Sequence, residues 1–208
     1  MDEPLSNLDA KLRNQMRAEI IKLRQRINTT FIYVTHDQTE AMTLGDRIVI
    51  MKDGFIQQVG TPQQVFDHPA NLFVAGFIGT PQMNFFDGSL VKRNGRYFIE
   101  TDGLSVELSE DKQQRLVAKD VAEQQVTVGV RPEHVIIGQS GIPAKVDVSE
   151  MMGSSVHLHM SALGGDMIAI VPLNGEAAHY PMGMDVKLSF GGHVVHVFSK
   201  DDSKNLEW

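Results

Sequence analysis

Apolar residues recur at helical spacing near the start of the chain. Leu12, Met16, Ile20, Leu23 and Ile27 follow one another at steps of three and four, which places them on one face of an amphipathic helix. The opposite face is basic, and it predicts either an anion-binding patch or, as is more usual for a long surface helix, a solvated cationic face. The basic residues are Lys11, Arg13, Arg17, Lys22, Arg24 and Arg26.

A short apolar run after this helix predicts a buried strand. Residues 31–34 read Phe-Ile-Tyr-Val, which is typical of a strand covered on both faces in a parallel sheet. Two residues further on is His36. Asp37 and Glu40 then fit a capping box, in which each side chain accepts a backbone N–H at the start of a helix. We expect this helix to run to about Gly45, so that His36 lies at a strand-to-helix corner.

The next segment predicts a hairpin and a short helix. Residues 47–52 and 55–59 flank the Asp-Gly pair at 53–54, which favours a type I′ turn. Residues 61–64, Thr-Pro-Gln-Gln, supply an N-cap, a preset first helical φ and a capping partner. Strand, helix, hairpin and helix together indicate α/β organisation in the first part of the chain.

The hydrophobic period changes from helical to alternating after Pro81. Many short alternating runs separated by Gly-containing turns predict a small β-barrel or sandwich. Residues 111–125 predict one helical excursion within it. The predicted strands lie in residues 90–98, folded back at Asn94-Gly95, in 156–160 and 167–171 around Gly164-Gly165, and in 186–190.

Composition supports this division. The chain has 208 residues, of which 42% are hydrophobic, so it can bury one core and more readily two modest ones. The formal net charge is −7, divided into −1 for residues 1–83 and −6 for residues 84–208. We therefore expect one part at 1–83 and a second at 84–208. An acidic chain has no basic field for phosphate backbones, so nucleic acid is not an expected partner.

The cysteine count and the apolar runs bear on compartment. The chain has no cysteine, which excludes disulfides, thiolate metal sites and cysteine nucleophiles and fits a reducing compartment. No apolar run approaches the ~18 to 20 residues of a membrane span, and the acidic residues 1–3 lack the basic leader of a secretory signal. We expect a soluble, cytosolic chain.

Two short motifs carry the chemistry. Residues 2–4 read Asp-Glu-Pro and residues 6–9 read Ser-Asn-Leu-Asp, whereas residues 33–38 read Tyr-Val-Thr-His-Asp-Gln and are continued by Glu-Ala-Met at 40–42. The first motif resembles the end of the Walker B strand and the D-loop of an ABC transporter ATPase. The second resembles the switch-histidine loop of the same family.

The resemblance implies a role for each polar residue of these motifs, with ATP and Mg²⁺ as the cofactors of the intact protein. Asp2 would hold Mg²⁺ through a bound water, and Glu3 would polarise the attacking water as general base. His36 would contact the γ-phosphate, and Asp9 would reach across a dimer that sandwiches the nucleotide. Phosphoryl transfer requires mainly positioning and charge stabilisation, which suits adjacent carboxylates at the carboxyl edge of a strand.

Each motif also has a structural explanation. Residues 6–9 fit the Ser-x-x-Asp capping pattern, so they are expected to start the following helix whatever else they do. A single histidine after a strand is ordinarily a loop residue. Only its combination with residues 2–4 favours a phosphate role for His36.

Other parts of an ABC ATPase are missing from the sequence. The chain contains no Gly-x-x-x-x-Gly-Lys-Ser/Thr loop to cradle phosphates, no Leu-Ser-Gly-Gly-Gln signature and no glutamine loop. The strand that should precede Asp2 is reduced to Met1, which leaves open a native start, an engineered boundary or a proteolytic product. We therefore expect the C-terminal part of a longer protein, inactive and without micromolar ATP binding alone. The part of the ATPase sheet that is left would expose apolar surface. We expect this surface and the β domain to drive self-association.

The later motifs resemble one branch of that family. Residues 73–79, Phe-Val-Ala-Gly-Phe-Ile-Gly, residues 81–85, Pro-x-Met-Asn-Phe, and residues 129–134, Gly-Val-Arg-Pro-Glu-His, resemble the junction and accessory domain of carbohydrate-importing ABC ATPases of the maltose type. The resemblance implies an α/β remnant of the ATPase domain followed by an all-β, oligonucleotide-binding-like barrel of the TOBE type. It also implies a homodimer, permease subunits that hold the protein at the inner face of the membrane, and a regulatory protein as a further partner of the barrel. Arg131 and Glu133 are expected to make a structural ion pair or turn contact.

Two other functions stay open. The β domain from residue 84 can be a module that binds a small ligand or a protein without ATP. His157 and His159 share a strand face, with His193 and His196 further on, so a metal site is an alternative to ordinary half-exposed histidines. The transported solute is also open among maltose, other oligosaccharides, polyols and glycerol phosphate.

Overall fold

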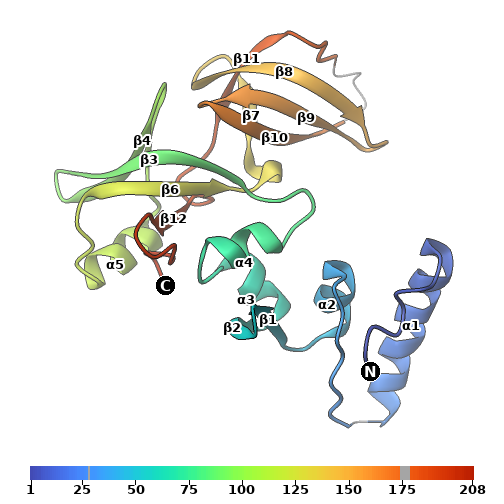
Figure 1. Ribbon diagram of the computed structural model, residues 1–208. Helices are drawn as coiled ribbons and strands as arrows, with labels where there is room; N and C mark the ends of the chain where they lie inside the picture. The colour runs from blue at the N-terminus through green and yellow to red at the C-terminus, as the bar shows by residue number, and fades with distance from the viewer. Residues whose placement is uncertain (28, 174–178) are drawn as a thin grey trace. The chain divides into compact units, whose positions relative to one another are not determined.

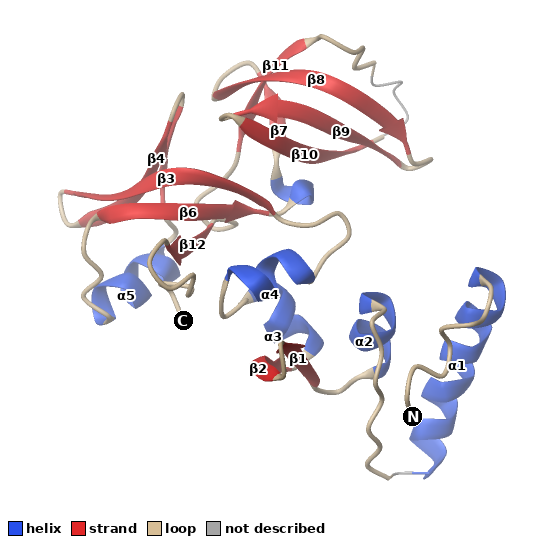
Figure 2. Ribbon diagram, in the orientation of Figure 1, coloured by secondary structure: helices blue, strands red, loops and turns tan. Residues whose placement is uncertain are grey.

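The computed structural model describes residues 1–27, 29–173 and 179–208. Two compact units make up the chain, Met1–Ala70 (unit 1) and Asn71–Trp208 (unit 2). Unit 1 contains helices and one hairpin, and unit 2 contains two antiparallel sheets (Figures 1 and 2). A small α/β part followed by a larger β part was the fold class expected from the sequence, and it is confirmed. None of the helices among the described residues is both long and apolar enough to cross a membrane.

Unit 1 follows the predicted order of elements except at residues 31–34, where a strand was expected. The elements are α1 (Ala10–Ile27), α2 (Gln38–Leu44), β1 (Ile48–Lys52), β2 (Phe55–Gly60) and α3 (Pro62–Asp67). Asp53 and Gly54 join β1 to β2 with φ angles of 51° and 81°, the pair of positive values that a type I′ turn requires. Thr61 and Gln64 form the predicted capping box at the start of α3.

The core of unit 1 is small. One buried cluster contains Leu5, Ile20 and Leu44, with Leu8, Ile21 and Tyr33 packed against them. The hairpin and α3 add the buried residues Ile48, Ile50 and Val65. The apolar face of α1 is correctly placed, but Leu23 and Ile27 on it are 46% and 55% exposed. Only the middle of α1 therefore finds apolar cover among the described residues.

The strand predicted at residues 31–34 is the main correction in unit 1. A single parallel bridge joins Asp2 to Val34, and no regular strand forms there. Ile32 is 78% exposed and Val34 is 50% exposed, so the run is not covered on both faces. Its apolar residues have the composition of a sheet interior, but among the described residues only the first three of the chain pair with it.

Unit 2 begins with α4 (Leu72–Phe77). Ala75 on this helix packs with Met83 and Phe198, and the N–H of Leu72 donates to the carbonyl of Ser203 at 2.9 Å. These contacts tie α4 to the end of the chain, so the unit boundary falls after Ala70. The sequence boundary proposed between residues 83 and 84 lies within unit 2 and stays a prediction about where two functional parts meet.

Two five-stranded antiparallel sheets form the body of unit 2 (Figure 1). The first has the order β12-β6-β3-β4-β5, and the second has the order β10-β9-β8-β11-β7. The elements are β3 (Asn84–Arg93), β4 (Arg96–Thr101), β5 (Leu104–Glu107), α5 (Glu110–Ala118), β6 (Gln124–Val130), η1 (Pro132–His134), β7 (Ile136–Gly138), β8 (Ile142–Met151), β9 (Ser155–Ala162), β10 (Gly165–Pro172), β11 (Asp185–Ser189) and β12 (His196–Ser199).

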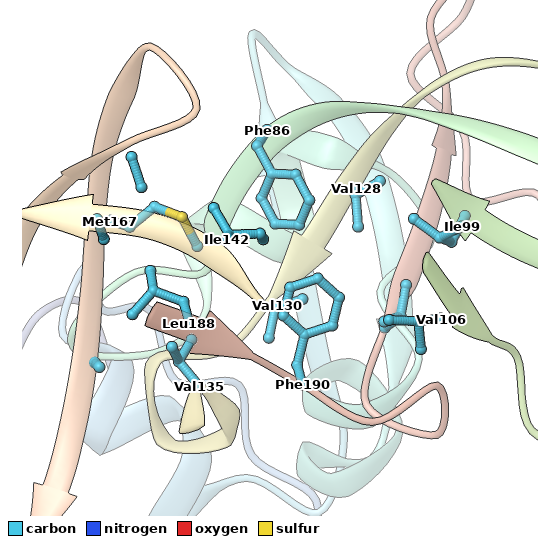
Figure 3. Close-up of a cluster of buried hydrophobic side chains, with 14 of the residues drawn as sticks. Phe86, Ile99, Val106, Val128, Val130, Val135, Ile142, Met167, Leu188 and Phe190 are labelled. Atoms are coloured by element: carbon cyan, nitrogen blue, oxygen red, sulfur yellow. The ribbon is translucent and has the colours of Figure 1, made fainter. Parts of the chain in front are cut away.

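One hydrophobic core joins the two sheets. Val128 and Val130 of β6 face Ile142, Met167 and Leu188 of the second sheet in this core (Figure 3). Buried residues alternate with partly or fully exposed ones along β9, as the sequence predicted. One turn differs by a residue: the left-handed positions before β10 are occupied by Leu163 and Gly164, not by the Gly164-Gly165 pair.

Two buried polar contacts cross unit 2. The side-chain amide of Asn84 donates to the carbonyl of Ile168 at 2.8 Å and accepts the N–H of the same residue at 2.7 Å, which joins β3 to β10. Nζ of Lys112 on α5 lies 2.5 Å from Oε2 of Glu207, and both side chains are buried. Burial raises the pKa of Glu207, and the Lys112 ammonium opposes that rise.

Candidate functional site

The first residues of the chain run parallel to the segment that precedes α2. The carbonyl of Met1 accepts the N–H of Val34 at 2.9 Å, and the N–H of Glu3 donates to the carbonyl of Val34 at 2.8 Å. Two paired parallel segments run in the same direction, so the residues that follow the pairing lie at the same edge. Asp2 and Glu3 on one segment therefore lie at the same edge as His36 on the other.

Glu3 and His36 are in direct contact. Oε1 of Glu3 lies 3.0 Å from Nδ1 of His36, and the side chains are 44% and 71% exposed. The hydrogen bond to Glu3 and the charge of this carboxylate raise the pKa of His36. Glu3 also has a φ of 40°, a left-handed conformation that is uncommon for a residue with a side chain and is found preferentially at functional positions.

Asp2 and Asp9 have different surroundings. Asp2 is exposed, and its backbone forms the bridge to Val34. Asp9 accepts the N–H of Leu12 at 2.9 Å, which makes it the N-cap of α1. The Ser-x-x-Asp tetrad does start this helix as predicted, but Asp9 is the capping residue, whereas the Ser6 hydroxyl donates to the carbonyl of Glu3 at 3.0 Å.

The His36 loop is held by Glu40, a residue that is 2% exposed. Oε2 of Glu40 accepts the hydroxyls of Tyr33 and Thr35, each at 2.9 Å. The pKa of Tyr33 is raised, first by burial and second by its hydrogen bond to Glu40. The predicted capping box is therefore half wrong: Asp37 accepts the N–H of Glu40, but Thr35 rather than Glu40 accepts the N–H of Asp37.

Arg13 is the residue of this region that sequence reasoning missed. It was assigned to the solvated basic face of α1, but its guanidinium reaches Asp37 at 3.5 Å and Glu40 at 4.0 Å. Its Nη2 also donates to the carbonyl of Leu8 at 3.0 Å. The available signal was its position one helical turn after the N-cap Asp9, which directs it toward the chain entering the helix.

The chemistry of this edge matches an acid and base pair beside a hard metal ion. A carboxylate such as that of Asp2 is the ligand type that Mg²⁺ prefers, and a carboxylate in contact with an imidazole can accept a proton from water. The left-handed Glu3 and the shared edge place these groups together without a covering side chain over His36. The residues present therefore fit one side of a metal and phosphate site.

Unit 2 contains a cleft. Within the described ranges, no group of three or more His, Cys, Asp or Glu residues is placed to hold a metal ion, so the histidine alternative gains no support. His159 instead lies 3.2 Å from Glu150. A cleft of about 620 Å³ is lined by Asp87, Glu100 and Gln125 and by the apolar Leu163, among others.

Comparison with known protein families divides the second unit in two. Residues 79–135 match the MalK OB fold domain, and residues 128–198 match the TOBE domain. Arg131, in the overlap, is 2% exposed and donates to the carbonyl of Ile78 at 2.8 Å. This contact is structural, whereas the ion pair or turn contact expected for Arg131 and Glu133 stays a prediction.

Relatives match along nearly the whole chain. It is 50% identical over 203 residues to the uncharacterized ABC transporter ATP-binding protein YurJ of Bacillus subtilis, covering 94% of this chain and 54% of YurJ. It is 50% identical over 209 residues to the oligosaccharides import ATP-binding protein MsmX of the same organism, covering 97% and 55%. It is 45% identical over 204 residues to the uncharacterized ABC transporter ATP-binding protein YcjV of Escherichia coli O6:H1, covering 97% and 55%. The chain thus spans about half the length of the curated relatives it matches.

Proposed function

Because this chain belongs to the family of ABC transporter ATP-binding proteins with MalK-type OB-fold and TOBE domains, we propose that it is part of an energy-coupling subunit. That subunit hydrolyses ATP to drive the import of a sugar or related solute. The observation that carries this proposal is the contact of Glu3 with His36 at 3.0 Å, at the edge where Asp2 also lies. The name of MsmX, an oligosaccharide importer, supports a sugar as the solute.

Glu3 has the chemistry of the general base in this proposal. Its carboxylate accepts the proton of the attacking water, and His36 donates a hydrogen bond toward the terminal phosphate. Their mutual contact orients both side chains before substrate arrives. The raised pKa of His36 increases the fraction of imidazolium near neutral pH, which favours binding of an anion.

Asp2 and Asp9 complete the proposed set. Asp2 would hold Mg²⁺, which supplies charge neutralisation to the phosphates when it is bound. Asp9 caps α1 through one oxygen, Oδ1, and we assign it the role of reaching a second copy of the subunit across the nucleotide. A homodimer, permease subunits, a location on the inner face of the membrane and a regulatory protein on unit 2 are parts of the same proposal.

The chain by itself is proposed to be inactive. No Gly-rich phosphate loop is present in its sequence, so the β- and γ-phosphates lack a backbone cradle and a lysine. A titration with a fluorescent ATP analogue and Mg²⁺ is expected to show no micromolar site. One tight, Mg²⁺-dependent site per chain would refute this point without touching the family assignment.

The role of Glu3 can be tested in a chimera that joins this chain to the part of MsmX that it does not span. Glu3→Gln is expected to reduce ATP turnover at least about 100-fold, the range for loss of a general base, while ATP binding is retained. Asp46→Asn is the matched control, because Asp46 is an exposed carboxylate paired with Arg24 away from the edge. Retained turnover in Glu3→Gln would rule out the assigned base.

A ligand-binding module is the second candidate function, and the cleft in unit 2 is the observation that favours it. Lys200 lies 2.8 Å from Asp87, and Arg93 pairs with Glu100. Asp87 and Glu100, two of the three carboxylates that line the cleft, are therefore each paired with a cation. This pairing favours a neutral polar ligand over a cation. Residues 71–208 expressed alone should fold and shift their cleft resonances with a small polyol or oligosaccharide if this function holds. A folded fragment without such shifts would remove the observation's support.

A further inference from the structure

Arg13 links the two segments that carry Asp9 and His36. It lies in the first turns of α1, and its side chain is 32% exposed. Nη2 donates to the carbonyl of Leu8 at 3.0 Å, immediately before Asp9. Nη1 lies 3.5 Å from Oδ2 of Asp37, immediately after His36. One guanidinium therefore contacts both the residue before Asp9 and the residue after His36.

The electrostatics of the loop require this cation. Glu40 is buried, and its Oε2 accepts hydroxyls from Tyr33 and Thr35. Its Oε1 faces the guanidinium, with Nε of Arg13 4.0 Å away. A buried carboxylate without a cationic partner is strongly unfavourable. Arg13 thus compensates the charge of Glu40. Its planar guanidinium also fixes the orientation of the groups that it contacts.

We propose that Arg13 is a positioning residue that holds the Ser6–Asp9 segment and the His36 loop in one arrangement. Arg13 acts on Asp9 and His36 through their neighbours Leu8 and Asp37. A shift of the first segment is transmitted to the second because both are bonded to the same rigid group. The inference rests on the proposed roles of His36 and Asp9, whereas the coupling itself exists without nucleotide.

Arg24 provides a matched control on the same helix. Its Nη1 donates to the carbonyl of Leu44 at 2.6 Å and lies 3.2 Å from Asp46. Like Arg13, it binds one carbonyl and one carboxylate and joins α1 to the α2 region. It lies at the other end of α2, away from His36, so it shares the anchoring of α1 but not the proposed positioning.

The experiment is NMR of the whole chain with labelled histidine and backbone amides. Arg13→Gln is expected to shift the His36 ring signals and the amides of Leu8 and Asp9 together, and to speed exchange of these amides by about tenfold. Arg24→Gln should leave all of them in place and move only the signals around Leu44. Equal shifts in both variants, or a shift on one side of Arg13 only, would overturn the proposal.

A second variant covers the case in which Arg13→Gln unfolds unit 1. Arg13→Lys keeps the positive charge near Glu40 but loses the fork. It is expected to keep the Leu5, Ile20 and Leu44 methyl signals unchanged while the His36 and Asp9 signals still shift. Unchanged His36 and Asp9 signals in Arg13→Lys would show that charge alone acts, and the positioning role would be wrong. No nucleotide is used, so failure here is distinct from failure of the Glu3→Gln turnover test.

Discussion

Unit 1 and unit 2 differ in how their apolar residues are used. In unit 2 both sheets share one continuous core, and residues such as Leu158 and Leu188 are fully buried. In unit 1 one buried cluster holds Leu5, Ile20 and Leu44, and Ile48, Ile50 and Val65 are buried elsewhere in the unit. By contrast, Ile32 and Phe55 are 78% and 73% exposed. The unit with the candidate site therefore has the smaller core.

This difference separates two ways of placing a side chain. The polar groups of unit 1 are held by short-range bonds to backbone and carboxylate groups, as at Asp9, His36 and Glu40. The strands of unit 2 are held by burial and register. A polar site can thus keep its local geometry where the segments around it form no regular sheet, but these bonds add little global stability.

The largest expected effect is in the core of unit 2. Lys112→Met leaves the buried carboxylate of Glu207 without its cation, which should lower the free energy of unfolding by about 3–5 kcal/mol. Denaturant unfolding followed by fluorescence of Trp208, the only tryptophan, measures this change. Lys204→Met is the control, because its pair with Asp202 is exposed and should contribute no more than about 1 kcal/mol.

The sign of the pH dependence sharpens this prediction. Burial raises the pKa of Glu207 above 4.5, and removal of Lys112 raises it further. The protonated form is then favoured in the folded state, so the penalty in Lys112→Met should be largest at neutral pH and should shrink as pH falls through the folded pKa. A penalty that does not change with pH would contradict a charged Glu207.

The second prediction compares the two cores directly. Leu158→Ala removes a fully buried side chain of unit 2 and should cost about 2–5 kcal/mol. Ile20→Ala, in the three-residue cluster of unit 1, should cost about 2 kcal/mol or less, because its loosely packed neighbours can collapse. The same denaturation monitors Leu158→Ala, and far-UV circular dichroism of the helical signal monitors Ile20→Ala. Equal costs would break the contrast between the units.

The sequence predicted the second unit better than the first for a physical reason. Alternation along residues 156–160 and the Asn94-Gly95 turn depend on neighbours within the same hairpin, so the pattern and the structure agree. Residues 31–34 also have a strand pattern, but a buried strand needs partners on both sides, which the local sequence does not encode. The run therefore forms only the bridge at Val34.

The candidate site was predictable in part for the same reason. Asp2, Glu3 and His36 were selected by motif, and the structure brings Glu3 and His36 into contact. Arg13 was not, because its role depends on how α1 packs beside α2. Composition and spacing identify a charged helix face but not which of its charges turns inward.

The third prediction concerns the exposed apolar residues of unit 1. Ile32→Lys should weaken self-association and raise the dissociation constant by about tenfold, since burial of one such side chain contributes about 1.5–3 kcal/mol. Sedimentation equilibrium at tens of micromolar measures it. Thr30→Lys, nearby, adds the same charge without removing an apolar side chain. A folded monomer in the unmodified chain at these concentrations would contradict the prediction.

The smallest expected effect is at the Glu3–His36 contact, which is exposed to solvent. The pKa of His36 should lie above 6.5 in the chain and fall toward that value in Glu3→Gln. Any stability from the pair is fully present below about pH 6.5 and is lost as pH rises through the folded pKa. NMR titration of His36 tests this directly, and the same pKa in both proteins would show that the carboxylate does not act on the ring.

The two hydrogen bonds between Asn84 and Ile168 also affect how unit 2 can contact other polypeptides. β10 is a border strand of its sheet, and Ile168 lies within it with both backbone groups taken by the amide of Asn84. Unpaired groups on such a border are where another polypeptide adds a strand. Asn84 therefore occupies one pair of backbone groups on this border, and changing it to an apolar residue would leave that pair open to another polypeptide even where the fold survives.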